Sequence, residues 1–300
     1  MRTDVVIPTW NRADLILDCL AHLERDPSPH RAIVVDNGST DDTVEQVRTQ
    51  YPDALVVALP ENLGFGAAVN AGLRAAESEH VVLINNDANV VPGFVERMCA
   101  PLADPQVGMV AGVLVDPRTG RVDSAGVVAD RSLSGHAYRW AEDPETLAPA
   151  DAFLLGPCGG AAAYRREAVL AIGAFDEAMF AYSEDLDVGL RMRAAGWSCA
   201  LATDARAIHV GSATLGKRSE FQTRVASFSR GYIAGRYRLA ARWLAAELLL
   251  GTAAAARART LLPLRERVRG WRAGRKLPAR AVPADLALEP WVQAQRRALG

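Results

Sequence analysis

Short runs rich in Val and Ile alternate with longer amphipathic segments over the first hundred residues, and this alternation limits the fold more than any other feature. The apolar runs have the length of buried strands and lie at 4–8, 32–35, 54–59 and 80–84. Helical patterns lie between and after them, at 13–24, 42–50, 66–76 and 92–103. Strands and helices that alternate at this spacing predict right-handed βαβ units and a parallel sheet.

The pattern changes after about residue 107. Further strands are expected at 107–115, 121–128, 153–164, 197–203 and 207–210. A helix is expected from Glu184 to Ala195, with Ser183 as its N-cap and Gly196 at its end. Beyond Gly211 the composition is helical, and prolines break it into pieces. The chain therefore reads as an α/β body followed by a helical extension.

Charge is divided unevenly between these two parts. Residues 1–216 contain 16 Lys and Arg against 30 Asp and Glu, whereas residues 217–300 contain 18 against 5. A basic tail on an acidic body indicates an anionic partner such as a phospholipid surface, a lipid phosphate or a nucleic acid. The alternative is a helical tail that docks on the acidic body with its arginines solvated. The sequence leaves both interpretations open.

The cysteines and the apolar segments indicate the cellular compartment in which the protein is expected. The four cysteines are scattered without a C-x-x-C pair, which argues against a zinc cluster or a disulfide framework and suits a reducing cytosol. The N-terminus lacks the apolar core of a signal peptide, so we expect a cytoplasmic protein. The apolar stretch Trp243–Ala256 is too short to span a membrane and is flanked by arginines. It predicts an interfacial amphipathic helix on the inner face of the cell membrane or, equally, a helix packed on the body.

A polar or glycine-bearing segment follows each of the first four strands. These segments lie at 8–12, 36–42, 60–66 and 85–87. Ligands of parallel sheets bind where the carboxyl ends of the strands converge, so we expect the binding site at this edge. No Gly-x-Gly-x-x-Gly or Gly-Lys-Ser/Thr motif is present, which argues against nicotinamide binding and against a phosphate loop.

Four residues, two of them in these segments and two later in the chain, have chemistry that suits a reaction of a nucleotide substrate. Asp36 can accept a hydrogen bond from the imide N–H that uracil and thymine share. Asp87 is a hard oxygen ligand for Mg²⁺ or Mn²⁺, and His209, at a later strand end, is the candidate second ligand. Asp185, in the first turn of the acidic helix, is the candidate general base.

Taken together, the motifs resemble the GT-A-fold glycosyltransferases of family 2, in the bacterial rhamnosyltransferase and galactofuranosyltransferase branch. The matching pieces occur in family order at 6–12, 34–41, 62–66, 70–72, 83–87, 184–187 with Arg191 and Gly196, and 209. The resemblance implies an α/β, Rossmann-like, mostly parallel sheet flanked by helices, with a C-terminal helical extension. It divides the chain into a catalytic domain at 1–215, with a nucleotide-binding half at 1–105 and an acceptor-binding half at 106–215, and a basic extension at 216–300.

The resemblance also assigns roles to residues. Asp36 would hold the base, and the rest of the nucleotide pocket would comprise Pro8, Thr9, Arg12, Asn37, Asn62, Asn70 and Asn86. Asp87 and His209 would hold the divalent cation, and Asp185 would act as base. The family's Asp-x-Asp motif is here Asn85-Asn86-Asp87, which leaves less negative charge at the site. Two cations beyond His209, Lys217 and Arg218, are a candidate lid over the diphosphate.

The implied reaction is inverting, metal-dependent transfer of rhamnose or another hexose from a dTDP- or UDP-sugar to a saccharide or polyprenyl-linked glycan. The Gln-x-x-Arg-Trp motif of processive members has no counterpart, since Leu239–Trp243 keeps only the final Arg-Trp pair. We expect no nucleic acid partner; an anionic membrane surface and a homodimer remain candidate partners. A nucleotidyltransferase and a non-catalytic sugar- or nucleotide-binding module are the alternatives.

Overall fold

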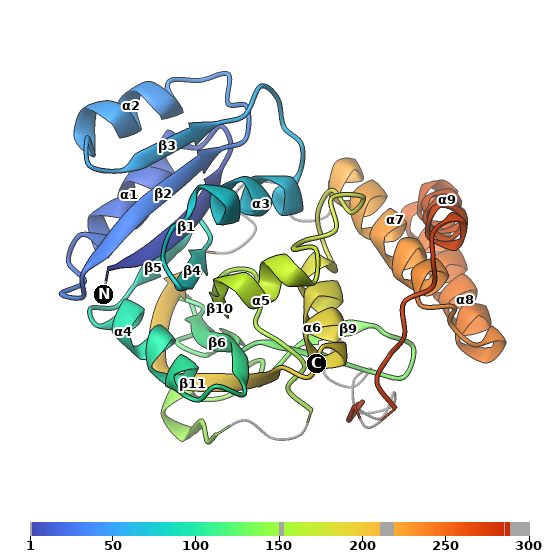
Figure 1. The fold of residues 1–300 in the computed structure, drawn as a ribbon. Coiled ribbons are helices and arrows are strands. Elements are labelled where there is room, and N and C mark those ends of the chain that lie inside the picture. Colours follow the sequence, from blue (N-terminus) through green and yellow to red (C-terminus); the bar gives the residue numbers. More distant parts are fainter. Residues whose placement is uncertain (1, 150–152, 211–218, 285, 289–300) are drawn as a thin grey trace.

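The computed structural model describes residues 2–149, 153–210, 219–284 and 286–288. A twisted central sheet crosses the body of the molecule, and a separate layer of helices stands beside it (Figure 1). Four parallel strands form the first half of the sheet, in the order β3-β2-β1-β4. They are β1 (Thr3–Thr9), β2 (His30–Asp36), β3 (Leu55–Ala58) and β4 (His80–Ile84). The parallel sheet expected from the alternating pattern is present.

The second half of the sheet is mixed. Strand β10 (Ala161–Arg165) lies antiparallel between β4 and β6 (Val107–Val115). Strand β11 (Ser198–His209) runs parallel to β6, and β5 (Ala88–Val90) pairs antiparallel with β11 at the edge. Three short strands lie outside this order: β7 (Val122–Ser124), which pairs with β6, and the hairpin β8 (Val127–Ala129) and β9 (Gly135–Ala137).

This strand order brings several chain segments to one edge of the sheet. The carboxyl ends of β1, β2 and β4 share that edge because the three strands are parallel. Ala161 at the start of β10 pairs with Ile84 at the end of β4, and His209 at the end of β11 pairs with Ala88. The turn before β10 and the end of β11 therefore reach the same edge, although they come from the second half of the chain.

Helices cover both faces of the sheet. Side chains alternate along each strand, so Val5 and Ile7 of β1 pack on one face and Val6 on the other. Helices α1 (Ala13–Leu23), α2 (Thr43–Gln50) and α4 (Phe94–Cys99) cover the first face, and α3 (Phe65–Ala75), α5 (Arg166–Ala171) and α6 (Glu184–Ala194) cover the second. Single 3-10 turns lie at Ala100–Ala103 and Pro144–Thr146. The first four helices match their expected positions to within two residues, apart from Pro92–Ala103, where α4 is shorter and ends in the 3-10 turn.

Local expectations differ from the structure in four places. The strand expected at 121–128 is divided into β7, which pairs with β6, and β8, which pairs with β9. The strands expected at 197–203 and 207–210 are one strand, β11, with a register shift between Leu201 and Arg206. The strand expected at 153–164 forms only over Ala161–Arg165. Ser183 precedes α6 but makes no side-chain cap, because its backbone is left-handed, with a φ of 69°. The chain needs that conformation to turn from the preceding loop into the helix.

The C-terminal extension contains α7 (Glu220–Arg236), α8 (Ala241–Ala258) and α9 (Leu262–Lys276). Helices α7 and α9 cross at a pair of matched glycine positions, Gly231 and Gly235 on one helix and Gly270 and Gly274 on the other. A Cβ atom at Gly231 would overlap the carbonyl of Arg267, and one at Gly270 would overlap that of Phe228. The glycines therefore let the two backbones approach more closely than any other residue would allow.

A buried polar network joins this extension to the α/β body. Asp187 of α6 is fully buried and accepts hydrogen bonds from Arg191, from the hydroxyl of Tyr237 at 2.8 Å and from Arg280 at 2.6 Å. Arg280 also lies 2.8 Å from Asp176. The extension is thus packed on the helix that begins with Glu184 and Asp185. Among the helices that the structure describes, none is long and apolar enough to cross a membrane.

Candidate functional site

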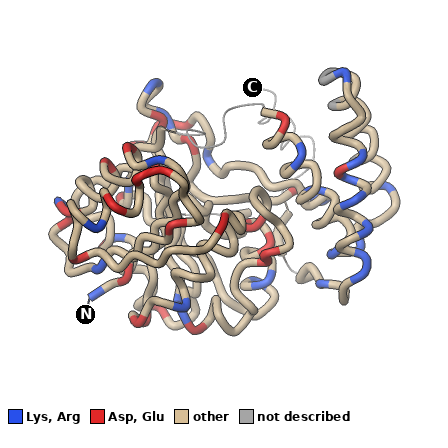
Figure 2. Tube along the Cα trace, turned by 90° about the horizontal axis from the view of Figure 1, so that it is seen from above, with Lys and Arg blue, Asp and Glu red and all other residues tan. Residues whose placement is uncertain are grey.

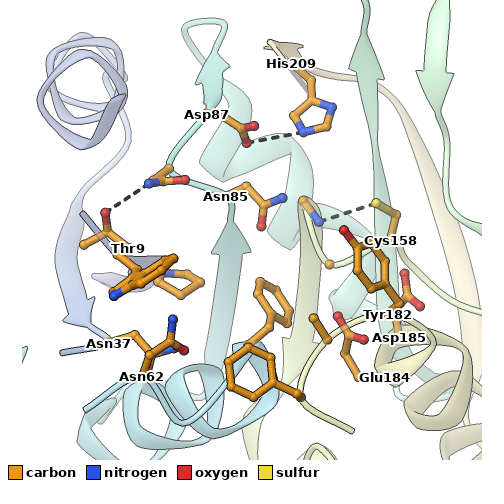
Figure 3. A pocket seen from close by; sticks show the side chains of 18 residues that line it. Thr9, Asn37, Asn62, Asn85, Asp87, Cys158, Tyr182, Glu184, Asp185 and His209 are labelled. Carbon is orange, nitrogen blue, oxygen red and sulfur yellow. Dashed lines mark hydrogen bonds and ion pairs between the residues drawn. The ribbon is translucent and has the colours of Figure 1, made fainter. Parts of the chain in front are cut away.

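A cavity of about 370 Å³ opens at the strand-end edge of the sheet (Figure 3). Thr9, Asn37 and Asn62 lie on one side, Glu184 and Asp185 on the opposite side, and Asp87 with His209 between them in the figure. The lining comprises Pro8, Thr9, Trp10, Asn37, Asn62, Phe65, Asn85, Asn86, Asp87, Cys158, Gly159, Gly160, Phe180, Ala181, Tyr182, Glu184, Asp185 and His209. The segments after β1, β2, β3 and β4 meet in one cavity, as the strand order requires.

Five of the eight residues predicted for the nucleotide pocket line this cavity. They are Pro8, Thr9, Asn37, Asn62 and Asn86. The Asn86 amide donates to the Thr9 hydroxyl at 3.0 Å, which ties the end of β4 to the end of β1. The Asn37 amide donates to the side-chain oxygen of Asn62, also at 3.0 Å. These amides hold the loops in register with one another.

Gly64 is the residue that lets the 60–66 loop close on the opposite wall. Its φ is 92°, in the left-handed region, and a Cβ there would overlap the Phe180 carbonyl. That carbonyl accepts a hydrogen bond from the Phe65 N–H at 2.7 Å. A side chain at this position would push the two walls of the cavity apart.

Asp36, at the carboxyl end of β2, does not itself line the cavity, although its strand neighbour Thr9 and the next residue, Asn37, do. One carboxylate oxygen, Oδ2, accepts the backbone N–H of Ser39 at 3.1 Å. The other, Oδ1, is buried and has no hydrogen-bond partner among the described residues. A buried carboxylate oxygen without a partner is costly unless a ligand donor reaches it.

Arg12 and Asn70 were predicted for the nucleotide pocket, but neither lines the cavity. Arg12 makes a two-pronged ion pair with Asp14, with both contacts at 2.7 Å. The Asn70 amide group donates to the Phe175 carbonyl and to Glu177, and its oxygen accepts the Phe175 N–H. Asn70 therefore anchors the 175–177 segment to α3. The candidate lid residues Lys217 and Arg218 lie outside the described residues.

The two residues predicted to hold a metal face each other. His209 Nε2 lies 3.3 Å from Asp87 Oδ1, and His209 Nδ1 lies 2.7 Å from Asp123 Oδ2 in β7. Burial lowers the pKa of His209, but its hydrogen bonds to Asp123 and Asp87 and their negative charges outweigh that effect and raise the pKa to about 9. A metal-free site would therefore hold His209 in its protonated form at neutral pH.

This donor set fits a hard divalent cation that a substrate helps to bind. Mg²⁺ sites in proteins commonly use one or two side chains and leave the remaining positions to phosphate and water. Asp87 and His209 supply one oxygen and one nitrogen, and the described residues contain no group of three or more candidate ligands. A carboxylate on the second nitrogen of a ligand histidine, here Asp123, is the arrangement that orients such a ligand.

Two adjacent carboxylates begin α6 on the other side of the cavity. Burial and then the charge of Asp185 raise the pKa of Glu184 to about 8. Burial also raises the pKa of Asp185, against the opposing effect of the Leu186 N–H, which donates to Oδ1 at 2.7 Å. Glu184 Oε2 has no partner among the described residues. The pair can hold one proton between them at neutral pH, which suits a group that accepts a proton from a substrate.

Comparison with known proteins identifies the family. The model of the family described as glycosyl transferase family 2 matches residues 4–173, more than half of the chain. The chain belongs to this family. In this family 2 chain the matched region contains the strand ends from Thr9 to Asp87, and the resemblance read from the motifs is confirmed.

Curated relatives agree with that assignment. An N-acetylglucosaminyl-diphospho-decaprenol L-rhamnosyltransferase of Mycobacterium tuberculosis is 29% identical over 204 residues, which cover 60% of this chain and 66% of that protein. The O-antigen biosynthesis protein RfbC of Myxococcus xanthus is 28% identical over 226 residues, 71% of this chain and 18% of that protein. The chain thus spans just under two thirds of the first relative and a small part of the second.

Two solved structures share the fold. The mannosyltransferase PcManGT of Pyrobaculum calidifontis, in complex with GDP-Man and Mn²⁺, has a TM-score of 0.56 at 22% identity and covers 99% of this chain and 79% of its own. GalNAc-T7 with UDP, GalNAc and Mn²⁺ has a TM-score of 0.62 at 12% identity and covers 93% of this chain and 55% of its own. The expected GT-A fold is confirmed.

Sequence reasoning missed three groups that belong to the site. Asp123 lies in a short strand without a recognisable motif, and only the pairing of β7 with β6 brings it to His209. Glu184 was treated as a helix-terminal acid, although its side chain lines the cavity. An aromatic wall from Phe65, Phe180 and Tyr182 also lines it. For Glu184, the available signal was its polar neighbours in the sequence. For the aromatic wall, the signal was the glycine at 64 directly before Phe65.

Proposed function

We propose that this family 2 chain is a non-processive, inverting, metal-dependent glycosyltransferase that moves a hexose from a nucleotide donor to a hydroxyl of a glycan. The observation that carries the proposal is the single cavity lined at once by Asp87 and His209, by Asp185 and by Thr9, Asn37 and Asn62. These groups match a divalent-cation site, a general base and a polar nucleotide pocket.

For the donor, we propose a dTDP- or UDP-sugar whose base binds in the 1–105 half. The buried and unpartnered Oδ1 of Asp36 supports this, because an imide N–H is a suitable donor for it. A rhamnose-like sugar is favoured by the similarity to the mycobacterial L-rhamnosyltransferase. PcManGT holds GDP-Man, so a guanine nucleotide belongs in any donor screen.

Asp87 and His209 would hold Mg²⁺ or Mn²⁺ beside the donor diphosphate. The cation, when bound, neutralises the charge that grows on the departing diphosphate. Asp123 keeps the His209 ring in place through Nδ1 and leaves Nε2 directed at Asp87. The presence of Mn²⁺ in the GalNAc-T7 structure is consistent with this role.

Asp185 would take the proton from the incoming hydroxyl as that oxygen attacks the anomeric carbon. One displacement from the face opposite the diphosphate inverts the anomeric configuration. Burial raises the pKa of Asp185 and makes its carboxylate a stronger base than an exposed aspartate. The adjacent Glu184, whose pKa is raised to about 8, would stay protonated and leave Asp185 as the ionised member of the pair.

For the acceptor, we propose a saccharide or a polyprenyl-linked glycan bound by the 106–215 half. The aromatic side chains Phe180 and Tyr182 on that wall provide apolar faces on which sugar rings stack. The name of the mycobacterial relative, which specifies a diphospho-decaprenol acceptor, supports a lipid-linked substrate. A cytoplasmic location and a homodimer stay predictions.

The test is nucleoside diphosphate release from purified protein with a panel of dTDP-, UDP- and GDP-sugars and with Mg²⁺ or Mn²⁺. We expect release with a dTDP- or UDP-sugar that an acceptor accelerates, and we expect Asp185→Asn to lower turnover by roughly 10²–10⁴-fold while donor affinity remains. Asp53→Asn, at an exposed carboxylate in the turn before β3 and outside the cavity lining, is the matched control.

Two outcomes contradict the proposal. Donor binding without any diphosphate release in the presence of glycan acceptors would favour a binding module. Release of pyrophosphate from a nucleoside triphosphate and a sugar phosphate would favour a nucleotidyltransferase.

A further inference from the structure

Helix α8 exposes three consecutive leucines, which are spread around its axis because successive helical positions lie about 100° apart. Leu249 is 71% exposed, Leu248 41% and Leu250 38%, and Leu261, in the turn after the helix, is 67% exposed. Leu244 and Leu248 lie four residues apart on one face of the helix and line a groove with Val268 and Trp271 of α9, whereas Leu249 and Leu250 lie outside that groove. Several exposed leucines on one short segment indicate that the segment binds an apolar partner.

Helix α9 presents a stripe of cations beside these leucines. Arg265, Arg269, Arg272 and Lys276 recur at intervals of four, three and four residues, so they lie along one side of the helix, and all four are exposed. Arg269 pairs with Glu266 at 3.0 Å. The other three have no ion pair with any acidic side chain that the structure describes. Their charge is therefore available to a partner.

The exposed leucines approach the cationic stripe at the groove between the helices. Leu248 of α8 and Arg272 of α9 line it together. Exposed Arg242 and Arg259 lie at the two ends of α8 and extend the cationic border around the leucines. Figure 2 shows basic positions recurring along these helices, whereas acidic positions gather on the body. Residues 219–284 contain 14 Lys and Arg against 3 Asp and Glu.

We propose that the face formed by Leu249, Leu250 and Leu261 with the cations of α9 docks on an anionic phospholipid bilayer. A bilayer offers both of the chemistries that the face requires, since phosphate headgroups bind the arginines and the acyl boundary takes up the leucines. A nucleic acid would leave the leucines exposed. A second copy would bring the same cations into contact with each other, which opposes association.

The position of the face relative to the cavity makes docking useful. Phe221, near the start of α7, packs edge-on against Phe180 of the cavity wall, with 5.5 Å between ring centres. From there α7 runs for 17 residues against α9. The bilayer contact and the cavity are thus joined by one helix of about 25 Å, which suits an acceptor anchored in a membrane.

The experiment is flotation of the full chain with vesicles of phosphatidylcholine alone and of phosphatidylcholine mixed with phosphatidylglycerol, without donor or acceptor. We expect binding to the mixed vesicles only, weakened by salt. The variant R265S/R272S/K276S should bind roughly 100-fold more weakly. Leu249→Ser should lower binding by roughly 10-fold, because it removes an apolar side chain without changing charge.

The matched control is R25S/R48S/R74S, which removes the same charge from exposed positions on the catalytic body and should bind as the unmodified chain does. Absence of binding to mixed vesicles, or equal loss in the control, overturns the proposal. So does a concentration-dependent dimer in the absence of vesicles that Leu249→Ser abolishes, since the face would then belong to a second copy. Because no sugar chemistry is measured, failure here is separate from failure of the proposed transferase activity.

Discussion

The imidazole of His209 is held between two carboxylates, with Nδ1 at 2.7 Å from Asp123 and Nε2 at 3.3 Å from Asp87. The three residues come from β7, from the turn after β4 and from the end of β11. Asp123 lies 86 residues from its partner. Asp123 fixes the orientation of the ring and directs its other nitrogen toward Asp87 in the cavity lining.

We expect Asp123→Asn to weaken Mn²⁺ binding by about 10–100-fold, the usual effect of losing the outer partner of a metal-ligating histidine. Calorimetric titration of Mn²⁺ in the presence of nucleoside diphosphate measures this directly, apart from turnover. Asp53→Asn serves as control. Unchanged Mn²⁺ affinity in Asp123→Asn would show that Asp123 has no part in orienting His209.

The paired acids Glu184 and Asp185 predict an unusual pH dependence. A general base works only when ionised, and burial raises the pKa of both groups, so kcat/KM should fall as the pH is lowered through the titration of the pair. Burial raises the pKa of Asp185, and the charge of Asp185 in turn raises that of Glu184, so Asp185 ionises first. The acid limb in Glu184→Gln should therefore stay at the pH seen in the unmodified enzyme. An acid limb that moves to lower pH in Glu184→Gln would show that the charge of Glu184 raises the pKa of the base.

Asp4 predicts a pH-dependent contribution to stability. Burial raises its pKa, but Arg31 at 2.7 Å and the N–H groups of Glu77 and Ser78 outweigh that effect and lower the pKa from 3.8 to about 2. A depressed pKa stabilises the fold above pH 3.8, and this stabilisation is lost as the pH falls through about 2.

Asp4→Asn should therefore reduce the free energy of unfolding by about 2 kcal/mol at neutral pH, with a difference that shrinks below pH ~4. Urea unfolding of both proteins over a series of pH values measures it. A difference that stays constant into the acid range would mean that ionisation of Asp4 is not the source.

The crossing of α7 and α9 predicts a steric effect at Gly231. Alanine there would force its Cβ into the Arg267 carbonyl, so the helices must separate, at a cost of about 1–3 kcal/mol. Thermal unfolding of Gly231→Ala should show a lower midpoint. Gly135→Ala is the control, because its Cβ would meet only ordinary contacts at 3.6 Å or more. Equal midpoints for the two variants would mean that the helices do not pack this closely.

The secondary structure of the first half could be read from the chain because it depends on local periodicity. Val5, Val6 and Ile7 predicted a strand buried on both faces, and that is where they lie. The second half was harder to predict. Its strand pairings join distant segments, and β11 continues through residues 204–206, where no apolar run predicts a strand.

For the site, the sequence by itself determined which groups follow the strand ends, among them Thr9, Asn37 and Asp87. Only the tertiary structure decided that Asp123 reaches His209, that Glu184 faces the cavity, and that Arg12 and Asn70 turn to other partners. The physical reason is the sequence distance over which each effect acts. Backbone propensity and side-chain spacing act over a few residues, whereas these contacts depend on the order in which β4, β10, β6 and β11 pair across the sheet.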